Sequence, residues 1–333
     1  MEKVILGLSG GVDSAVSARL LKKQGYEVLG LFLDIGAEAA RQDAIAVAEY
    51  LGIPLKCLDI TAELEKNVCA PFTAAYLRGE TPNPCIMCNP TVKFKALCDY
   101  ADEQGAEYIA TGHYALAEKG CIYKGHPQND QSYMLCRVKR EQAARLLLPL
   151  GSFAKERVRD LALEMDLPVA KKPDSMEICF IPDKDYAGFI AKRAETPPPG
   201  SFVFNGSVIG QHEGIHRYTV GQRRPGLYNE RKLYISEIRP ETNEVILSLW
   251  DDLFKTEVRA RDMSWLIETP AQPLRASVKV RHTKSDEPEC TASYDAARGE
   301  VHFSLDSPVR APARGQSAVL YDGERVLGGG FII

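Results

Sequence analysis

The chain has 333 residues, of which 45% are hydrophobic and 26% are charged, as expected for a globular protein of two or three domains. No apolar run approaches the roughly 18 residues that a membrane-spanning helix needs, which excludes a membrane protein. The formal net charge of −4 argues against nucleic-acid binding through a broadly basic surface. The N-terminus enters a strand-like run without a secretory signal, so we expect a cytoplasmic protein.

The first part of the chain alternates between strand-like and helix-like segments. This alternation predicts βαβ units, and therefore an α/β fold with a doubly wound parallel sheet. The expected strands lie at 4–8, 28–33, 55–60 and 108–111, and the expected helices at 12–20, 40–51, 91–104, 140–147 and 155–165.

Three consecutive prolines at 197–199 mark a change in the pattern, because they cannot continue a helix and form a stiff connector. Short β-rich runs separated by turn signals follow them, which favours two small all-β modules, the last of them barrel-like. We therefore predict an α/β domain at 1–196, a small β-rich domain at 197–258 and a barrel-like domain at 259–333.

A glycine-rich hexapeptide, Ser9-Gly10-Gly11-Val12-Asp13-Ser14, stands between the first expected strand and the first expected helix. Its two glycines permit positive φ, so successive N–H groups can converge on an anion. The helix N-terminus adds unpaired donors and its dipole, which predicts a phosphate-binding loop. Asp13 is a candidate for capping the helix or holding a magnesium ion. The plain alternative is an ordinary turn with Asp13 or Ser14 as N-cap.

The hexapeptide resembles the pyrophosphate loop (PP-loop) of the N-type ATP pyrophosphatases. The resemblance implies that ATP adenylates a substrate oxygen and that pyrophosphate is released. The loop alone does not identify the substrate, because argininosuccinate, GMP and NAD synthetases carry similar loops.

Nine cysteines are an odd number for a disulfide framework, so sulfur, metal or redox chemistry is expected where they cluster. Cys85 and Cys88 form a Cys-x-x-Cys pair where a helix is expected to begin. Such a position predicts a lowered thiol pKa, because the helix dipole favours the thiolate. Cys179 stands between apolar residues farther along the chain. The other six cysteines are single and read as core thiols.

Taken together, the motifs resemble the tRNA 2-thiouridylase family over essentially the whole chain. They are the hexapeptide and the segments 81–89, 110–114, 129–133, 175–181, 218–223 and 315–319. The resemblance implies a tRNA-uridine 2-sulfurtransferase that adenylates the C2 oxygen of the wobble uridine in the tRNAs for Glu, Gln and Lys and replaces it with sulfur. The uridine would have to leave the anticodon stack to reach the pocket.

The resemblance also implies roles for individual residues, with Cys88 as the nucleophile, Cys179 as the persulfide carrier and a disulfide between them as sulfur leaves. ATP with magnesium would be bound by Gly7, Leu8, Ser9, Gly10, Gly11, Val12, Asp13, Ser14, Leu33 and Gly112. The target base would meet Asn83, Pro84 and Cys85. The tRNA would also contact His113, Asn129, Asp130, Gln131, Arg281, His282 and Gln316. Two of these residues also have a purely structural explanation. His113 could be a histidine in a turn whose ring is hydrogen-bonded within the protein, and Arg281 could be an arginine on a strand that faces solvent.

Cys85 departs from the family pattern, because many members carry an aspartate at this position. Cys85, Cys88 and Cys179 could therefore supply three thiolates to a 4Fe–4S cluster whose open iron binds hydrosulfide. A persulfide relay and a zinc site are the alternatives for the same three residues. A second departure is the short segment 34–37, where relatives often have a longer acidic insert.

Two rival functions remain at this stage: another adenylating enzyme of the PP-loop class, such as a small-molecule synthetase or amidotransferase, and a non-catalytic RNA-binding or metal-storage protein. For the favoured function, the expected partners are the anticodon region of tRNA and a sulfur donor, either a cysteine desulfurase, a relay protein or free sulfide. By analogy with the family, we expect a monomer.

Overall fold

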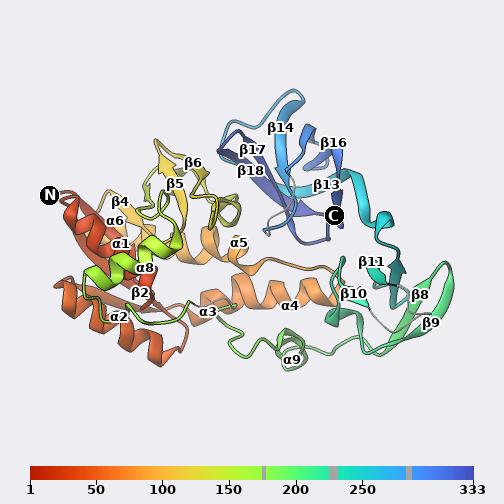
Figure 1. Ribbon diagram of the computed structural model, residues 1–333, viewed down its shortest axis with the longest axis horizontal. Coiled ribbons are helices and arrows are strands. Elements are labelled where there is room, and N and C mark those ends of the chain that lie inside the picture. The colour runs from red at the N-terminus through yellow and green to blue at the C-terminus, as the bar shows by residue number, and fades with distance from the viewer. Residues whose placement is uncertain (175–177, 225–231, 283–286) are drawn as a thin grey trace.

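A computed structural model describes residues 1–174, 178–224, 232–282 and 287–333. Residues 175–177 of the motif at 175–181 therefore lie outside the described residues. In Figure 1 the N-terminal α/β domain and a β-barrel are joined by long connections, with a small sheet at the far side. No helix among the described residues is long and apolar enough to cross a membrane.

The N-terminal domain is built on a five-stranded parallel sheet in the order β3-β2-β1-β4-β7. The chain order reverses direction beside β1, as in a doubly wound sheet, so this prediction is confirmed. Its strands are β1 (Lys3–Gly7), β2 (Glu27–Asp34), β3 (Leu55–Asp59), β4 (Tyr108–Ala110) and β7 (Leu146–Leu147).

Helices cover both faces of this sheet because its strands alternate buried side chains between the two sides. Val4 and Leu6 of β1 pack in one core with residues of α1, α2 and α8, while Ile5 packs on the other side with residues of α6. These helices are α1 (Val12–Lys23), α2 (Glu38–Leu51), α6 (Phe94–Gln104) and α8 (Lys155–Glu164).

The helix expected at 140–147 is wrong in its second half. Helix α7 (Arg140–Ala143) ends early, and Leu146 and Leu147 form the edge strand β7 beside Ile109 and Ala110. A short apolar run fits either a helix face or a buried strand. Here it forms a strand because it pairs with the edge of β4.

The connection between β3 and α6 carries the Cys-x-x-Cys pair. It consists of α3 (Thr61–Leu64), the π-helix η1 (Glu65–Cys69), α4 (Ala70–Leu77), α5 (Pro84–Cys88) and the π-helix η2 (Asn89–Lys93). Short helical pieces elsewhere are η3 (Ser132–Leu135), α9 (Tyr186–Ala191), η4 (Ile215–Arg217) and η5 (Asp251–Leu253).

The small sheet has the order β10-β11-β12-β8-β9 and its own apolar core. Strands β8 and β9 are joined by Asn205 and Gly206, both with positive φ, as a tight hairpin turn requires. The strands are β8 (Gly200–Phe204), β9 (Ser207–His212), β10 (Arg223–Arg224), β11 (Leu233–Arg239) and β12 (Glu244–Ser248).

The C-terminal strands close into an antiparallel barrel, because β13 pairs with both β16 and β18. The barrel-like prediction is thus confirmed. Its strands are β13 (Phe254–Trp265), β14 (Leu274–Lys279), β15 (Glu289–Asp295), β16 (Glu300–Arg310), β17 (Ser317–Asp322) and β18 (Arg325–Ile332).

An unexpected hairpin from the N-terminal domain extends the barrel sheet. Its strands are β5 (Ala115–Glu118) and β6 (Cys121–Lys124), and β6 pairs with β18 at Tyr123 and Arg325. A hairpin of the N-terminal domain and the barrel therefore share a continuous sheet, which fixes the barrel beside the connection that follows β4.

Candidate active site

The glycine-rich loop follows β1 directly and leads into α1. Gly10 has a φ of 71°, and a side chain there would run into the backbone of the α2 segment at Ala40. Gly11 is the N-cap of α1 and no side chain caps the helix, so the expectation that Asp13 or Ser14 caps it is wrong. The free N–H groups at this helix N-terminus therefore stay available to an anion.

The serine hydroxyls shape the loop instead. The Ser14 hydroxyl accepts a hydrogen bond from the Ser9 N–H at 3.2 Å and donates to the Gly11 carbonyl at 3.0 Å. Gly112, which follows β4, packs against the start of α1, where a Cβ would lie 3.1 Å from Asp13 and from the Ser14 nitrogen. The lack of a side chain at Gly112 therefore lets the chain after β4 approach the start of α1 closely.

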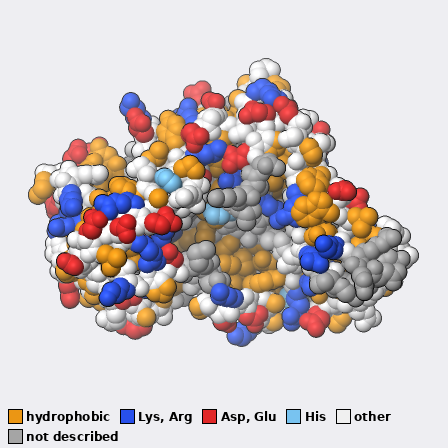
Figure 2. Space-filling view, viewed as in Figure 1, with side chains coloured by type: hydrophobic (Ala, Val, Ile, Leu, Met, Phe, Trp, Pro, Cys, Tyr) orange, Lys and Arg blue, Asp and Glu red, His pale blue; other side chains and the backbone are white. Residues whose placement is uncertain are grey.

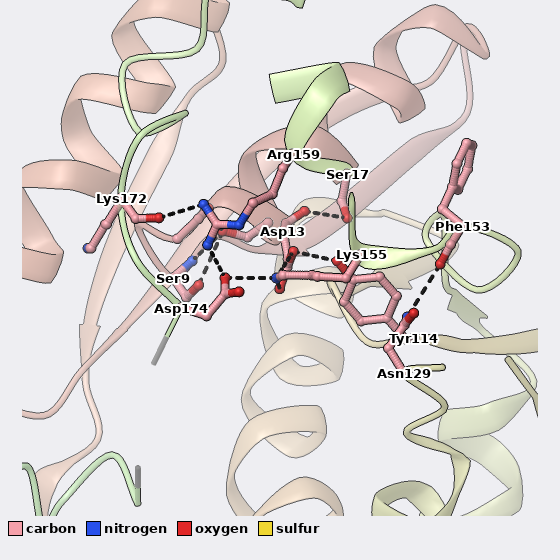
Figure 3. Close-up of polar contacts among 12 residues, drawn as sticks. Ser9, Asp13, Ser17, Tyr114, Asn129, Phe153, Lys155, Arg159, Lys172 and Asp174 are labelled. Carbon is pink, nitrogen blue, oxygen red and sulfur yellow. Dashed lines mark hydrogen bonds and ion pairs between the residues drawn. The ribbon is translucent and has the colours of Figure 1, made fainter. Parts of the chain in front are cut away.

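The Asp13 carboxylate is the centre of a polar network rather than a helix cap (Figure 3). It accepts a 2.6 Å hydrogen bond from the Tyr114 hydroxyl and 2.7 Å hydrogen bonds from the Lys155 ammonium. Lys155 also lies 2.9 Å from Asp174, and Asp174 lies 2.6 Å from Arg159. Two carboxylates and two cations therefore alternate at the mouth of the loop.

A third cation approaches the loop from the segment after α8. Lys172 donates to the Gly10 carbonyl at 2.9 Å and pairs with Asp43 of α2, while its own carbonyl accepts from Arg159 at 2.9 Å. The sequence analysis did not identify these basic residues. The spacing of four between Lys155 and Arg159 places both on one helix face, but nothing in the sequence shows that this face meets the loop.

The three cysteines singled out by sequence lie within electrostatic range of one another. Cys85 and Cys179 are exposed, and Cys88 is half-buried at the last position of α5. The negative charges of Cys88 and Cys85 contribute to raising the pKa of Cys179. The structure therefore brings together two chain segments that are about ninety positions apart in sequence, a separation read from the residue numbers.

The expectation of a lowered thiol pKa at Cys88 is wrong. Desolvation raises the pKa of Cys88, with Lys93 acting in the opposite direction, and desolvation raises the pKa of Cys179 to about 11. Cys88 still lies near the start of a helical run that continues through η2 and α6, so desolvation outweighs the helix dipole at this thiol. Both thiols are protonated near neutral pH.

A cavity of about 260 Å³ opens beside Cys85. Asn83 caps α5 by accepting the Cys85 N–H at 3.1 Å, and Pro84 takes the first helical position, which suits its fixed φ. Gln316 reaches the same cavity from the barrel. The remaining lining residues are Pro82, Met134 and Ile178. Asn83, Pro84, Cys85 and Gln316, which were expected to meet RNA, thus share one opening.

A second cavity of about 330 Å³ lies beside Cys179 at the end of β2. Cys69 also lines it, and its pKa is raised to about 11, mainly by desolvation. Leu33 packs in the same apolar cluster as Cys69 and Cys88. The end of β2, where Leu33 is expected to contact nucleotide, therefore adjoins the thiols. Figure 2 shows hydrophobic side chains in the hollow between the α/β domain and the barrel.

Several other residues expected to contact tRNA have structural partners. The His113 ring bonds Thr111 at 2.7 Å, and burial holds its pKa well below the usual value. This contact agrees with a satisfied turn histidine. Asn129 donates to the Phe153 carbonyl, Gln131 accepts from the Tyr114 N–H, and Asp130 accepts from Gly125 and Ser132.

Arg281 is not a solvated strand charge. Its guanidinium donates to the carbonyls of Val220 and Ala311, which ties the barrel to the small sheet. Burial lowers its pKa, and the nearby Arg310 adds to this effect. His282 follows it and packs edge-on against Tyr133 at 5.9 Å.

The donor chemistry of Cys85, Cys88 and Cys179 suits a soft metal or an iron–sulfur cluster. Among the described residues, however, no three His, Cys, Asp or Glu side chains are arranged to hold a metal ion. We therefore assign no step to a cluster or a zinc ion.

The doubly wound sheet, its anion-binding loop and the two β-rich modules define a PP-loop ATP pyrophosphatase with C-terminal extensions. Family models match the whole arrangement: the "tRNA methyl transferase HUP domain" at 2–183, the "tRNA methyl transferase PRC-barrel domain" at 187–249 and the "Aminomethyltransferase beta-barrel domain" at 255–332.

Full-length relatives identify the family. The chain is 40% identical to the tRNA-specific 2-thiouridylase MnmA of Acetivibrio thermocellus, over 99% of each chain. It is 41% identical to MnmA 2 of Thermoanaerobacter sp., over 99% of this chain and 97% of the relative. With MnmA of Clostridioides difficile the identity is 38%, over 99% and 98%. The chain belongs to the tRNA-specific 2-thiouridylase family.

Proposed function

We propose that this protein is an ATP-dependent tRNA-uridine 2-sulfurtransferase that converts the wobble uridine of the tRNAs for Glu, Gln and Lys to 2-thiouridine. The observation that carries the proposal is that the phosphate loop and the cysteines adjoin the same apolar cluster. Leu33, at the end of β2 beside the phosphate loop, packs in one apolar cluster with Cys88 and with Phe180, the neighbour of Cys179. An activated substrate oxygen and a sulfur carrier can therefore meet there.

The first step is adenylation of the uracil C2 oxygen. This oxygen is a poor leaving group until it is esterified to AMP, and pyrophosphate leaves as the ester forms. The loop from Gly7 to Ser14, with Leu33 and Gly112, binds the nucleotide in this proposal. The open N–H groups of the loop and the α1 dipole support it, because both stabilise the departing pyrophosphate.

Sulfur then arrives through a persulfide relay. A persulfide donor transfers its outer sulfur to the Cys179 thiolate and leaves as a thiolate. The outer sulfur of Cys179 attacks C2 and displaces AMP. Cys88 attacks the inner sulfur of Cys179, which releases 2-thiouridine and leaves a Cys88–Cys179 disulfide. A thiol reductant restores both cysteines with two electrons. The electrostatic interaction between these two cysteines supports the pairing.

The target base enters the cavity beside Asn83, Pro84 and Cys85 in this proposal. Cys85 is exposed there, and its thiol takes a position beside the base rather than acting as a carboxylate. The remaining RNA contacts are assigned to His113, Asn129, Asp130, Gln131, Arg281, His282 and Gln316. The corresponding domains are the catalytic domain at 1–196, the small domain at 197–258 and the barrel at 259–333.

We further propose that the enzyme works as a cytoplasmic monomer whose persulfide donor is a cysteine desulfurase or a relay protein. Support for a reducing compartment comes from the cysteines, all nine of which are free thiols in the structure.

Incubation with ATP, magnesium, unmodified tRNA and a persulfide donor tests the function. We expect 2-thiouridine and pyrophosphate to form together. A PP-loop synthetase for a small molecule would release pyrophosphate only with its own substrate, and a non-catalytic RNA-binding protein would release none. Either result would contradict the proposal.

A further inference from the structure

Basic side chains gather beside the phosphate loop. Lys155 and Arg159 reach the loop from one face of α8, and their side chains keep 24% and 31% of their accessible surface. Both side chains are therefore partly exposed to solvent. A partly exposed cation can exchange one anionic partner for another that binds it more strongly.

Asp174 supplies the anion that these two cations hold. Its carboxylate lies 2.9 Å from Lys155 and 2.6 Å from Arg159, so one oxygen atom bridges both residues. Burial raises the pKa of Asp174, but the hydrogen bonds from Arg159 and Lys155 outweigh this effect and hold the pKa below its ordinary value. The carboxylate is thus ionised at neutral pH and competes for both cations.

We propose that Lys155 and Arg159 bind the β- and γ-phosphates of ATP in this loop, and that Asp174 holds them in place until the nucleotide replaces it. Figure 3 shows Lys155 directed at Asp13 and Asp174, and Arg159 directed at Asp174. The inference rests on the use of ATP in the proposed function and names the residues that neutralise its phosphates.

The electrostatics of the loop explain why these cations are needed. The loop contributes N–H groups and the α1 dipole, but Asp13 and Asp174 place two negative charges at the same mouth. A triphosphate carries several negative charges, so without Lys155 and Arg159 it would meet repulsion from both carboxylates. Planar Arg159 and the point charge of Lys155 suit phosphate oxygens, as they suit carboxylates.

Equilibrium binding of Mg-ATP by calorimetry, without tRNA, tests the assignment. We expect Lys155→Met and Arg159→Gln each to weaken binding by about 10- to 100-fold, the range for losing a charge-assisted hydrogen bond. The matched controls are Lys171→Met, an exposed lysine of the same region, and Arg157→Gln, which pairs with Glu164 along the same helix. Both controls should bind ATP as the unchanged protein does.

The variant Asp174→Asn tests whether the Asp174 carboxylate competes with the ATP phosphates for the two cations or only stabilises the fold. If Asp174 competes with phosphate, its loss should tighten ATP binding by about 3- to 10-fold, a modest gain because the pair is partly exposed. Pyrophosphate alone should show the same order of affinities across the variants. Unchanged or weaker ATP binding by Asp174→Asn would overturn the competition, and normal binding by Lys155→Met and Arg159→Gln would overturn the phosphate role.

Failure of the proposed function would look different. If the unchanged protein binds Mg-ATP but produces no 2-thiouridine, the sulfur transfer is wrong while the binding comparison still decides the inference. Variants that bind ATP normally in a protein that does form 2-thiouridine would overturn the inference alone.

Discussion

The side chain of Gln316, in the barrel, donates a 2.7 Å hydrogen bond to the carbonyl of Thr81, just before the Cys-x-x-Cys helix. The Thr81 N–H in turn donates to the carbonyl of Arg314 at 2.7 Å. These two bonds hold the start of the segment 81–85 against the barrel. A residue that sequence analysis assigned to RNA contact thus also positions the loop that leads to Cys85.

Gln316→Ala should therefore affect both stability and substrate use. We expect the free energy of unfolding to fall by about 1 kcal/mol, the usual value of one lost hydrogen bond, and KM for tRNA to rise. Urea unfolding and steady-state thiolation measure the two effects. Gln211→Ala, on an exposed position of β9, serves as control. A rise in KM with unchanged stability would mean that Gln316 contacts RNA without positioning the loop.

The raised thiol pKa values predict a steep pH dependence of cysteine reactivity. Only the thiolate reacts, and Cys179 has a pKa of about 11, so its fraction of thiolate should rise about tenfold per pH unit between pH 7 and 10. Iodoacetamide labelling followed by peptide mass spectrometry measures this rate. Free cysteine, whose pKa is about 8.5, should level off within the same range. A plateau for Cys179 below pH 9 would contradict the desolvated environment.

Sequence reasoning succeeded where local pattern and topology agree. The alternation of apolar runs defined β1, β2, β3 and β4, and the glycines of the loop predicted its place between β1 and α1. It failed where the secondary structure depends on contacts with segments that are far away in the sequence. Leu146 and Leu147 became a strand because the edge beside Ile109 was open. The hairpin of β5 and β6 is defined by its pairing with a barrel two hundred positions away, which local sequence does not record.

The pKa of Cys88 and the charged partners of Asp13 could not be predicted from the sequence for the same reason. Position near a helix predicted a lowered pKa for Cys88, but desolvation by the surrounding cluster raises it. The partners of Asp13 come from α8 and from Asp174, which the chain reaches only after about 140 and 160 further positions, counted from the residue numbers. A helical spacing shows which residues share a face, and only the fold shows what that face meets.

Gly10→Ala should destroy nucleotide binding by distorting the loop. The residue has a φ of 71°, a region that alanine adopts at a cost of about 1 kcal/mol or more, and its Cβ would collide with the backbone at Ala40. We expect loss of Mg-ATP binding and a lower melting temperature. Gly25→Ala is the control, because Gly25 also has positive φ but a Cβ there meets nothing within 4 Å. If Gly10→Ala binds ATP normally, the loop does not bind the phosphates.

Glu287 should make the contact between barrel and hairpin sensitive to acid. Its carboxylate lies 2.5 Å from Lys124 of β6 and 3.2 Å from Lys279 of β14. Burial raises the pKa of Glu287, yet the two lysines outweigh it and lower the pKa overall. The stabilisation is therefore complete above the unfolded pKa of about 4.3 and disappears as pH falls through the lower folded value.

Glu287→Gln should accordingly lower the free energy of unfolding by about 1 kcal/mol at pH 7, and the difference should shrink as the pH falls below the unfolded pKa of about 4.3. Urea unfolding at pH 7 and at a series of lower pH values measures it. Asp306→Asn, whose exposed pair with Arg275 lies within the barrel, should cost less at pH 7. A constant difference for Glu287→Gln across this pH range would show that its charge does not stabilise the contact.

The persulfide relay predicts activity without iron. The relay uses thiols alone, so protein purified without oxygen should be colourless, contain no stoichiometric iron and still form 2-thiouridine from a persulfide donor. Cys88→Ser and Cys179→Ser should each abolish the product while circular dichroism stays unchanged, because serine is close to cysteine in size. Cys57→Ser, which changes an exposed thiol of β3, is the control and should stay active. Visible absorption with roughly four irons per chain, lost together with activity in Cys85→Ser, would replace the relay by a cluster that these thiols assemble only after rearrangement.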